Sequence, residues 1–314
     1  MLAAVPCADA DRVVLLDGAD GRERGRIPVG DHPVHLAEVA GAVFVATMGD
    51  RAVSVVENGT VTRVETGVLG PSHFAATDGG LVLVPCTGGD ALAVIDRESL
   101  ALVDRVGVGA EPHDVAVREG RAYVGSRGDG TVTVVDSAAG RALRTLDLGD
   151  GPRIQGVDAE FGGVYAVDQA GGRIALLSES ELIVSDMVGE NPYEAAFGPE
   201  NLYVAGRDDG TVTALSPDLS ETTVHDVGGS PSSVVVADGT PWLLDREDAR
   251  LRAVGSAETI SIPYPAFLGY VTPAGSSVIV SHYDDDRVSL VDLEAGETVW
   301  TAETPSKPFE PLAL

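Results

Sequence analysis

The most constraining feature of the sequence is a unit of 37 to 42 residues that recurs eight times along 314 residues. Each unit holds a turn with Asp or Gly, a β-run of the type TVTVVD, a second run, and a Gly-x-x-Pro segment or a relative of it. The β-runs begin at Arg12, Arg51, Ala91, Thr131, Arg173, Thr211, Arg250 and Arg287. The prolines that follow are Pro33, Pro71, Pro112, Pro152, Pro192, Pro231, Pro265 and Pro308.

A period near 40 residues with room for four short strands is typical of one blade of a β-propeller. A single blade cannot bury both of its faces, so successive blades must pack against one another. The sequence therefore predicts an all-β chain that forms an eight-bladed β-propeller of four-stranded antiparallel blades. A single domain spans residues 1–314. Seven blades is the alternative, but 314 residues divided by the period favour eight.

The repeats resemble the YVTN family of β-propellers, which includes surface-layer-like and lactonase-like proteins. The matching stretches are Tyr123–Ser126 (YVGS), followed by RGDGTVTVVD, and Tyr203–Gly206 (YVAG), followed by RDDGTVTALS. The resemblance covers essentially the whole chain and implies the fold, although seven blades is the usual number in the family. The family is functionally mixed, so the resemblance implies little about activity. The Asn of the YVTN motif is absent from every copy, so its role in the family does not carry over.

The family's strand order implies how the fold closes. The segment after each proline is the innermost strand A, and strands B, C and D follow it outward. The last strand A then starts at Pro308 and runs to Leu314, while residues 2–8, 12–17 and 22–29 supply strands B, C and D of the same blade. The C-terminal strand is therefore expected to pair with the N-terminal strands.

Net charge excludes several classes of partner. The chain has 49 Asp and Glu against 21 Lys and Arg, a net charge of −28, and its only lysine is Lys307. Binding to nucleic acid or to an anionic membrane needs clustered basic residues, so neither is expected. Near-complete loss of Lys with Asp above Glu is typical of a halophile's cytosolic protein, because molar salt screens self-repulsion over about 3 Å.

The compartment is expected to be the cytoplasm. The N-terminus has no basic segment before its short apolar run, so it does not look like a signal peptide. No stretch approaches 18 uninterrupted apolar residues. Cys7 and Cys86 alone make no disulfide framework. We expect a monomer whose partner is a small ligand or a protein.

The residues two positions after each proline are expected to line one mouth of the propeller channel. They are mostly polar: His35, His73, Asp114, Gln155 (with one inserted residue), Glu194, Ser233, Phe267 and Glu310. The next residue in each blade is non-polar, as period-two alternation requires. The end of strand B supplies a second tier, which includes Cys7, Cys86, Asp168, Asp245 and His282, and then Arg127, Arg207, Arg246 and Tyr283.

Two sectors of candidate site residues follow. The metal candidates, chosen because His, Cys and carboxylate are the usual transition-metal ligands, are His35, His73, Asp114, Glu310, Cys7 and Cys86. The candidates for binding a small anionic ligand are Arg127, Arg153, Arg207, Arg246, Gln155 and Glu194, because guanidinium groups bind carboxylate and phosphate through a planar fork. The competing interpretation is a hydrated polar channel with two inert core thiols.

Three functions are compatible with this pattern. The first is a non-enzymatic binding or scaffold module, favoured by uniformly short loops and by the absence of a GxSxG, P-loop, HExxH or GxGxxG motif. The second is a metal-assisted hydrolase, for which the resemblance to propeller lactonases assigns ligand and base roles to His35, His73, Asp114, Glu194 and Glu310. The third is a tetrapyrrole- or haem-binding redox protein, with an axial His and arginines that pair the macrocycle's carboxylates.

Overall fold

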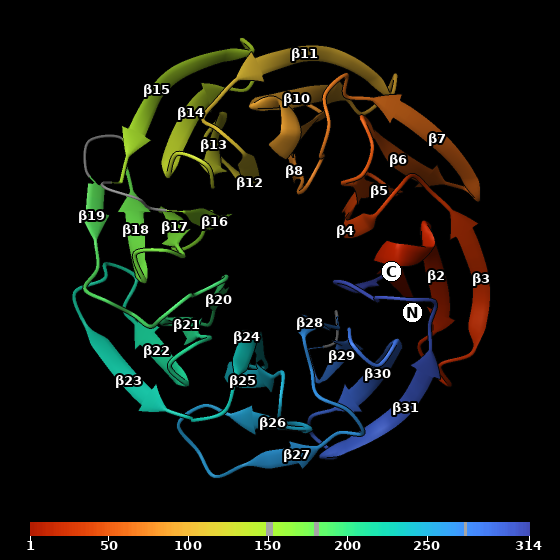
Figure 1. Cartoon of the computed structure of the whole chain (residues 1–314), viewed down its shortest axis with the longest axis vertical. Helices are drawn as coiled ribbons and strands as arrows, with labels where there is room; N and C mark the ends of the chain where they lie inside the picture. Colours follow the sequence, from red (N-terminus) through yellow and green to blue (C-terminus); the bar gives the residue numbers. More distant parts are fainter. Residues whose placement is uncertain (149–152, 179–181, 273–274) are drawn as a thin grey trace. The chain divides into compact units, whose positions relative to one another are not determined.

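The chain forms an eight-bladed β-propeller with four antiparallel strands in every blade, as predicted. The computed structural model describes residues 1–148, 153–178, 182–272 and 275–314, so Pro152 lies outside the described residues. Packing divides the chain into two compact units. Unit 1 comprises Met1–Val34 and Val188–Leu314, and unit 2 comprises His35–Met187. Figure 1 labels the strands of both units.

Unit 2 contains the first four blades, and the division between the units falls inside β4. Its strands are β4 (Pro33–Val39), β5 (Ala42–Thr47), β6 (Ala52–Glu57), β7 (Thr60–Glu65), β8 (Ala75–Ala76), β9 (Leu81–Cys86), β10 (Ala91–Asp96), β11 (Ala101–Gly107), β12 (Pro112–Arg118), β13 (Arg121–Ser126), β14 (Thr131–Asp136), β15 (Arg141–Asp147), β16 (Ile154–Asp158), β17 (Val164–Asp168), β18 (Arg173–Leu177) and β19 (Leu182–Val184). A short 3₁₀ turn, Thr87–Gly89, follows β9.

Unit 1 contains the other four blades. Its strands are β1 (Leu2–Cys7), β2 (Arg12–Asp17), β3 (Glu23–Pro28), β20 (Ala195–Phe197), β21 (Leu202–Gly206), β22 (Thr211–Leu215), β23 (Thr222–Asp226), β24 (Pro231–Ala237), β25 (Thr240–Asp245), β26 (Arg250–Ala253), β27 (Thr259–Ser261), β28 (Leu268–Val271), β29 (Ser277–His282), β30 (Arg287–Asp292), β31 (Glu297–Glu303) and β32 (Leu312–Ala313). A 3₁₀ turn, Ala8–Ala10, follows β1.

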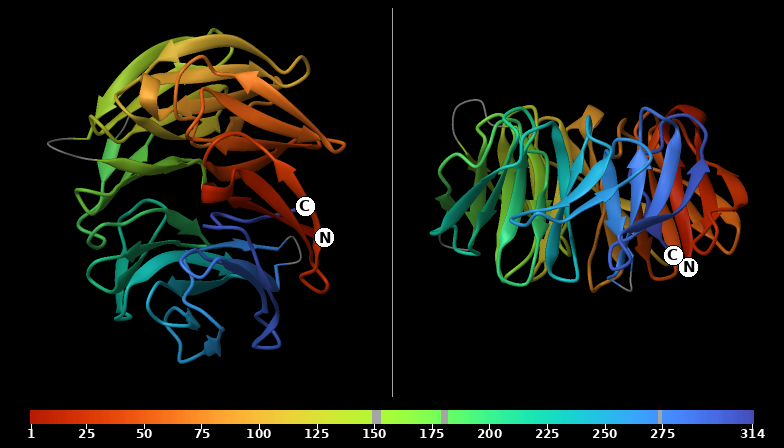
Figure 2. Two further views of the ribbon diagram at one scale, coloured as in Figure 1. Left: turned by 45° about the vertical axis from the view of Figure 1, so that its right-hand side comes forward. Right: turned by 90° about the horizontal axis from the view of Figure 1, so that it is seen from below.

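The predicted closure is confirmed, because β32 completes the sheet β3-β2-β1-β32. Ala3 pairs with Ala313 and Ala4 with Leu312. The backbone of Leu2 exchanges hydrogen bonds of 2.9 and 2.8 Å with Leu314, so the two termini lie side by side (Figure 2). The last eight residues therefore provide hydrogen-bond partners for backbone groups along one edge of β1.

Burial follows the repeat. The central run of β14, TVTVVD, buries its four middle residues, whereas the outer strand β15 exposes nearly all of its residues. Within each unit, apolar clusters join neighbouring blades; one joins β16–β18 to β12–β14 through Ile154, Val164 and Val134. Within a unit, neighbouring sheets thus cover each other's faces.

The prolines begin the innermost strands less regularly than the repeat implies. Pro33, Pro112 and Pro231 are the first residues of β4, β12 and β24. Pro71 and Pro308 make only isolated bridges, to Cys86 and Cys7 respectively. Proline has no N–H to give to a ladder, and a first position or an isolated bridge does not require one.

Register shifts near the start of three innermost strands alter which side chain faces which way. They fall between Pro112 and Asp114, between Ile154 and Gly156, and between Pro231 and Ser233. In each case one extra residue is bulged out of the ladder: His113, Gln155 or Ser232. A bulge shifts the alternation by one residue, so counting from proline does not give one facing rule for all blades.

In the described part of the chain, no helix is long and apolar enough to cross a membrane.

Candidate functional site

Unit 2 brings together three histidines from three successive blades. The ring centroids of His35 and His73 are 3.8 Å apart, and those of His73 and His113 are 4.6 Å apart. Gln155 from the fourth blade continues the series, because its Nε2 lies 3.3 Å from Nε2 of His113. We call His35, His73, His113 and Gln155 the histidine row. His35, His113 and Gln155 are 5% exposed or less, and His73 is half-buried.

Backbone carbonyl groups of neighbouring blades fix the tautomers in this row. Nδ1 of His73 lies 2.9 Å from the carbonyl oxygen of His113, and Nδ1 of His113 lies 2.9 Å from that of Gln155. A carbonyl only accepts, so each Nδ1 carries the proton and each Nε2 keeps its lone pair. Gln155 then donates to Nε2 of His113, and its own Oε1 is a buried acceptor without a hydrogen-bond partner.

Burial keeps the His73 and His113 imidazoles neutral. It lowers the pKa of His73 well below 6.5, and the neighbouring His35 and His113 rings lower it further. Burial also lowers the pKa of His113 to about 4, assisted by His35 and by the charge of Arg153, while the hydrogen bond to Gln155 acts in the opposite direction. Arg153 is therefore close enough to the row to influence it. The row presents lone pairs rather than charge.

The structure moves Asp114 away from the predicted mouth position. The bulge at His113 places that histidine in the row and turns Asp114 toward β16, whose Val157 N–H donates to Oδ2 at 2.8 Å. The N–H of Val115 donates to Oδ1 at 2.7 Å. Both carboxylate oxygens thus accept backbone hydrogen bonds, and Asp114 joins two blades.

Both cysteines are core residues rather than members of a mouth tier. Cys7 and Cys86 are fully buried in two apolar clusters, and their thiols point toward the carbonyl oxygens of Val5 and Val84. Burial raises the pKa of each thiol to about 12. A thiolate is the form that binds metal, so the structure accounts for both residues as small apolar side chains.

Other second-tier residues are structural. Asp168 and Asp245 are buried and pair with Arg173 at 3.0 Å and Arg252 at 2.6 Å. His282 is held between the carbonyl oxygen of Pro265 and Ser289 Oγ. The Asp168, Asp245 and His282 side chains are buried inside their blades, whereas the sequence predicted that they form a second tier at the channel mouth. Among the described residues, no three His, Cys, Asp or Glu side chains are arranged to hold a metal ion.

Unit 1 gathers cations and aromatic rings instead. The guanidinium carbon of Arg207 lies 4.5 Å from the ring centre of Tyr193 and 5.7 Å from that of Phe267. Arg246 lies over the same Phe267 ring at 5.2 Å. The Tyr283 and Phe309 rings lie 5.2 and 5.7 Å from Phe267, and Lys307 Nζ lies 4.5 Å from the Tyr283 ring. We call this group the arginine–aromatic cluster; its members are Tyr193, Arg207, Arg246, Phe267, Tyr283, Lys307 and Phe309.

The two arginines of the cluster differ from the arginines that are paired with carboxylates. Ten others form ion pairs with carboxylates: Arg22, Arg24, Arg26, Arg63, Arg97, Arg118, Arg173, Arg250, Arg252 and Arg287. Among the described residues, neither Arg207 nor Arg246 has a carboxylate within ion-pair distance. Burial lowers the pKa of Arg207 most and the charge of Arg246 lowers it further, although Tyr193, Glu194 and Asp208 partly compensate. An external anion bound to these guanidinium groups would offset the cost of burying Arg207 beside a second positive charge.

The remaining predicted ligand residues divide between the units. Arg127 and Arg153 belong to unit 2, and the buried Nε of Arg127 has no hydrogen-bond partner. Glu194 and Glu310 belong to unit 1 and are half-buried, and each has a partner of its own. Of the six residues predicted to bind an anionic ligand, the cluster contains Arg207 and Arg246, and Glu194 is close enough to influence Arg207.

Sequence reasoning named Phe267 and Tyr283 as lining residues but gave them no role, and it missed Tyr193 and Phe309. A signal was available: six Phe and seven Tyr occur in the whole chain, yet Tyr193, Phe267 and Phe309 each follow a repeat proline by one or two residues. A small pocket of about 70 Å³ adjoins the cluster, lined by Arg246, Pro265, Ala266, Phe267, Tyr283, Asp284 and Asp285.

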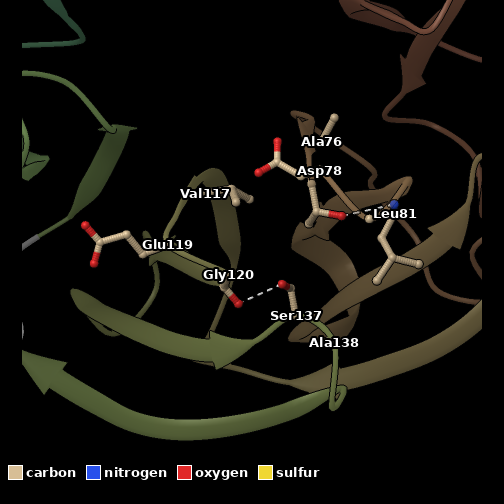
Figure 3. Close-up of a pocket in the computed structure, with 10 residues that line it drawn as sticks. Ala76, Asp78, Leu81, Val117, Glu119, Gly120, Ser137 and Ala138 are labelled. Carbon is tan, nitrogen blue, oxygen red and sulfur yellow. Dashed lines mark hydrogen bonds between the residues drawn. The ribbon is translucent and has the colours of Figure 1, made fainter.

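A second pocket, of about 480 Å³, lies in unit 2 between turns of two neighbouring blades (Figure 3). Asp78 and Glu119 stand at its sides, and Leu81 and Val117 form apolar walls. Ser137 Oγ donates to the carbonyl oxygen of Gly120 at 2.8 Å. Most of these residues are on turns or at the strand ends beside them, whereas the histidine row is near the beginnings of innermost strands.

Comparison with solved structures supports the fold. The chain is similar to apo AztD from Citrobacter koseri at 13% identity, covering 100% of this chain and 97% of that one, with a TM-score of 0.75. It is similar to the dihydro-heme d1 dehydrogenase NirN, solved in complex with DHE, at 16% identity over 99% and 74% of the two chains, with a TM-score of 0.82. A virginiamycin B lyase from Staphylococcus aureus matches at 10% identity over 75% and 84%, with a TM-score of 0.60. Identities this low show the fold alone.

No family model matches the sequence, and no curated protein does.

Proposed function

We propose that the protein is a non-enzymatic ligand-binding module and that its arginine–aromatic cluster binds a small anionic molecule. One observation carries the proposal: Arg207 and Arg246 lie over one Phe267 ring without an ion-pair partner among the described residues, in a chain with 49 acidic residues. Where acids are so abundant, a pair of unpaired guanidinium groups supports selection for an external anion. The aromatic faces hold both groups in place before a ligand arrives, which lowers the entropy cost of binding.

Calorimetric titration with inorganic phosphate and with benzoate tests the proposal. Replacing Arg207 by Gln removes a half-buried guanidinium and should weaken anion binding at least tenfold, since a charge-assisted hydrogen bond contributes about 1.5–3 kcal/mol. Arg246→Gln should have a smaller effect because Arg246 is exposed.

The matched control is Arg22→Gln, which makes the same charge change in the same unit at a side chain that is 79% exposed. It should leave the affinity within twofold. If the variant that carries both Arg207→Gln and Arg246→Gln bound both anions with the wild-type affinity, the proposal would be overturned.

A second candidate function is binding of a transition-metal ion at the histidine row. The observation in its favour is the fixed tautomer of His73, whose Nε2 lone pair is the donor that zinc and copper accept from neutral imidazole. Stacked His35 and His73 rings supply at most two such nitrogens side by side. Equilibrium dialysis with Zn²⁺ should show binding that His73→Ala abolishes and His225→Ala, on the outer strand β23, leaves intact. Equal zinc content in all three proteins would exclude this site.

The metal-assisted hydrolase and the tetrapyrrole protein stay as alternatives with a common test. Both require a metal or a coloured cofactor in the purified protein, so elemental analysis and a visible spectrum in high salt address them together. Asp114, assigned by the resemblance to the hydrolase site, has both oxygens occupied by backbone N–H groups, which argues against its use as a base. A tetrapyrrole would find an axial nitrogen at His73. A metal-free, colourless protein would exclude both.

We also propose that the protein is a cytoplasmic, salt-adapted monomer of the YVTN-repeat type that binds neither nucleic acid nor membranes. The charge of −28 and the two unpaired thiols support this setting. Light scattering and thermal melts between 0.1 and 3 M KCl test it: a monomer whose melting temperature rises steeply with salt is expected.

A further inference from the structure

The charges around the arginine–aromatic cluster indicate what kind of anion fits it; this step rests on the proposed function. Lys307, the third cation, is already paired with Asp284 at 2.9 Å. Arg207 and Arg246 therefore contribute two positive charges without a partner among the described residues. A carboxylate would neutralise one of them, whereas a phosphate monoester carries about −1.5 to −2 charges at pH 7 and offers three acceptor oxygens. Two guanidinium forks suit such a group.

The walls beside Arg246 indicate the body of the ligand. The adjoining pocket is lined by Pro265, Phe267 and Tyr283, which are apolar or aromatic, next to the guanidinium group. Phe267 and Tyr283 are half-buried and tilted by 49° to each other. A flat ring attached to the phosphate would contact these rings, and each aromatic contact of this kind contributes about 0.5–1.5 kcal/mol.

Two carboxylates in the same pocket limit the ligand's charge. Asp284 and Asp285 line the pocket together with Arg246 and the aromatic residues. Asp284 is compensated by Lys307, but Asp285 has no cation within ion-pair distance among the described residues. A second anionic group placed there would face a like charge at short range, which disfavours polyphosphates and carboxylated rings.

We propose that the cluster binds a phosphate monoester of a neutral aromatic molecule. Arg207 and Arg246 hold the phosphate, Phe267 and Tyr283 contact the ring, and Asp285 rejects ligands with a further negative group. The ligand is bound without being changed, so no bond is made or broken.

Four probes test the proposal by calorimetric titration at pH 7.5: phenyl phosphate, methyl phosphate, benzoate and 4-carboxyphenyl phosphate. Phenyl phosphate should bind at least tenfold more tightly than methyl phosphate or benzoate, and about tenfold more tightly than 4-carboxyphenyl phosphate. Its affinity should fall as pH decreases through about 6, where the second phosphate proton is taken up. Benzoate, ionised throughout, should show no such fall.

Variants separate the parts of the proposal. Phe267→Leu should lower the affinity for phenyl phosphate more than that for methyl phosphate, because it removes the ring contact in addition to the support of the two guanidinium groups. Asp285→Asn should bring 4-carboxyphenyl phosphate close to phenyl phosphate. Thermal melts confirm that each variant is folded.

The failures are distinguishable. If benzoate binds as tightly as phenyl phosphate and both depend on Arg207, the phosphate ester is wrong and the anion-binding function stands. If no probe binds, or if binding ignores both arginines, the proposed function itself is wrong.

Discussion

The histidine row and the arginine–aromatic cluster draw on adjacent places in the repeat but have opposite chemistry. The row forms where innermost strands of unit 2 begin, whereas the two arginines of the cluster directly follow β21 and β25, the second strands of two blades in unit 1. In the row, the His73 and His113 rings donate a hydrogen bond from Nδ1 to a backbone carbonyl group, and burial keeps both rings neutral. In the cluster, guanidinium groups rest on aromatic faces and stay charged, because no pKa shift makes an arginine neutral near pH 7.

The difference teaches how one repeat supports two kinds of site. A side chain that can lose its charge is compatible with complete burial, whereas one that cannot needs an aromatic face and partial exposure. The repeat therefore gives a neutral row where histidines stand at strand starts, and a charged cluster where arginines that follow second strands meet aromatic rings at such starts.

The largest expected effect comes from deleting Lys307–Leu314, which removes β32, Lys307 and Phe309 from unit 1. The N–H and carbonyl groups of Leu2, Ala4 and Ala8 would lose partners, and the cluster would lose two members. We expect loss of cooperative unfolding, monitored by calorimetry and circular dichroism. A truncated protein that melts within a few degrees of the full chain would contradict the closure. Hydrogen exchange should show greater loss of protection in β1 than in β13.

The next effect concerns the buried carboxylate of Asp245, which precedes Arg246 of the cluster in the sequence. Asp245 is fully buried and accepts hydrogen bonds from Arg252 at 2.6 Å and from the N–H groups of Glu247 and Asp248. Asp245→Ala leaves a charge and several donors unpaired, so we expect a loss of about 3–5 kcal/mol in the free energy of unfolding. Asp248→Ala, which breaks an exposed 3.7 Å pair with Arg250, should cost under about 0.5 kcal/mol. Similar costs for both variants would refute the structural role of Asp245.

Acid should weaken the row but not the cluster. The pKa of His113 is about 4 when folded and 6.5 when unfolded, so the unfolded chain binds more protons between these values. The contribution of neutral His113 to the free energy of unfolding is fully present above pH 6.5. It decreases as the pH falls and is lost below pH 4, a total of about 3 kcal/mol. His113→Gln should remove that part of the pH dependence in urea titrations between pH 7 and 4. His225→Gln should retain it, and identical curves for wild type and His113→Gln would show the row to be irrelevant.

The smallest effect tests the aromatic support of the cluster. Phe267→Leu removes the ring beneath Arg207 and Arg246, and we expect a loss of about 1 kcal/mol in stability. Phe161→Leu, at an exposed ring in unit 2, is the matched control for aromatic loss. A larger loss in the control would mean that Phe267 gives the cluster no particular support.

The repeat made the fold predictable. Eight β-runs of similar spacing predict eight blades, and the strand order implied by the family resemblance places the C-terminal strand against the N-terminal one, as β32 and β1 confirm. Such predictions succeed because each blade is a local unit, and its hydrophobic alternation is set by neighbours in the sequence.

The candidate site was predictable in part. His35, His73, Gln155, Arg207 and Arg246 were identified by position, and the structure places them in the row or the cluster. Asp114, Cys7 and Cys86 were assigned to the mouth, but a bulge redirects the first and the blade cores take the other two. Tyr193 and Phe309 were not considered at all.

What the sequence alone determined is the architecture: blade number, strand order and closure depend on a pattern repeated eight times, so a local irregularity cannot change them. What only the tertiary structure decided is which side chains meet. One bulged residue shifts the alternation in a strand, and the His73 and His113 rings bond to carbonyl groups 40 and 42 positions away in the next blade. The contact of Arg246 with Phe267 likewise joins residues that are distant in the sequence. A local alternation pattern does not show which of these side chains meet.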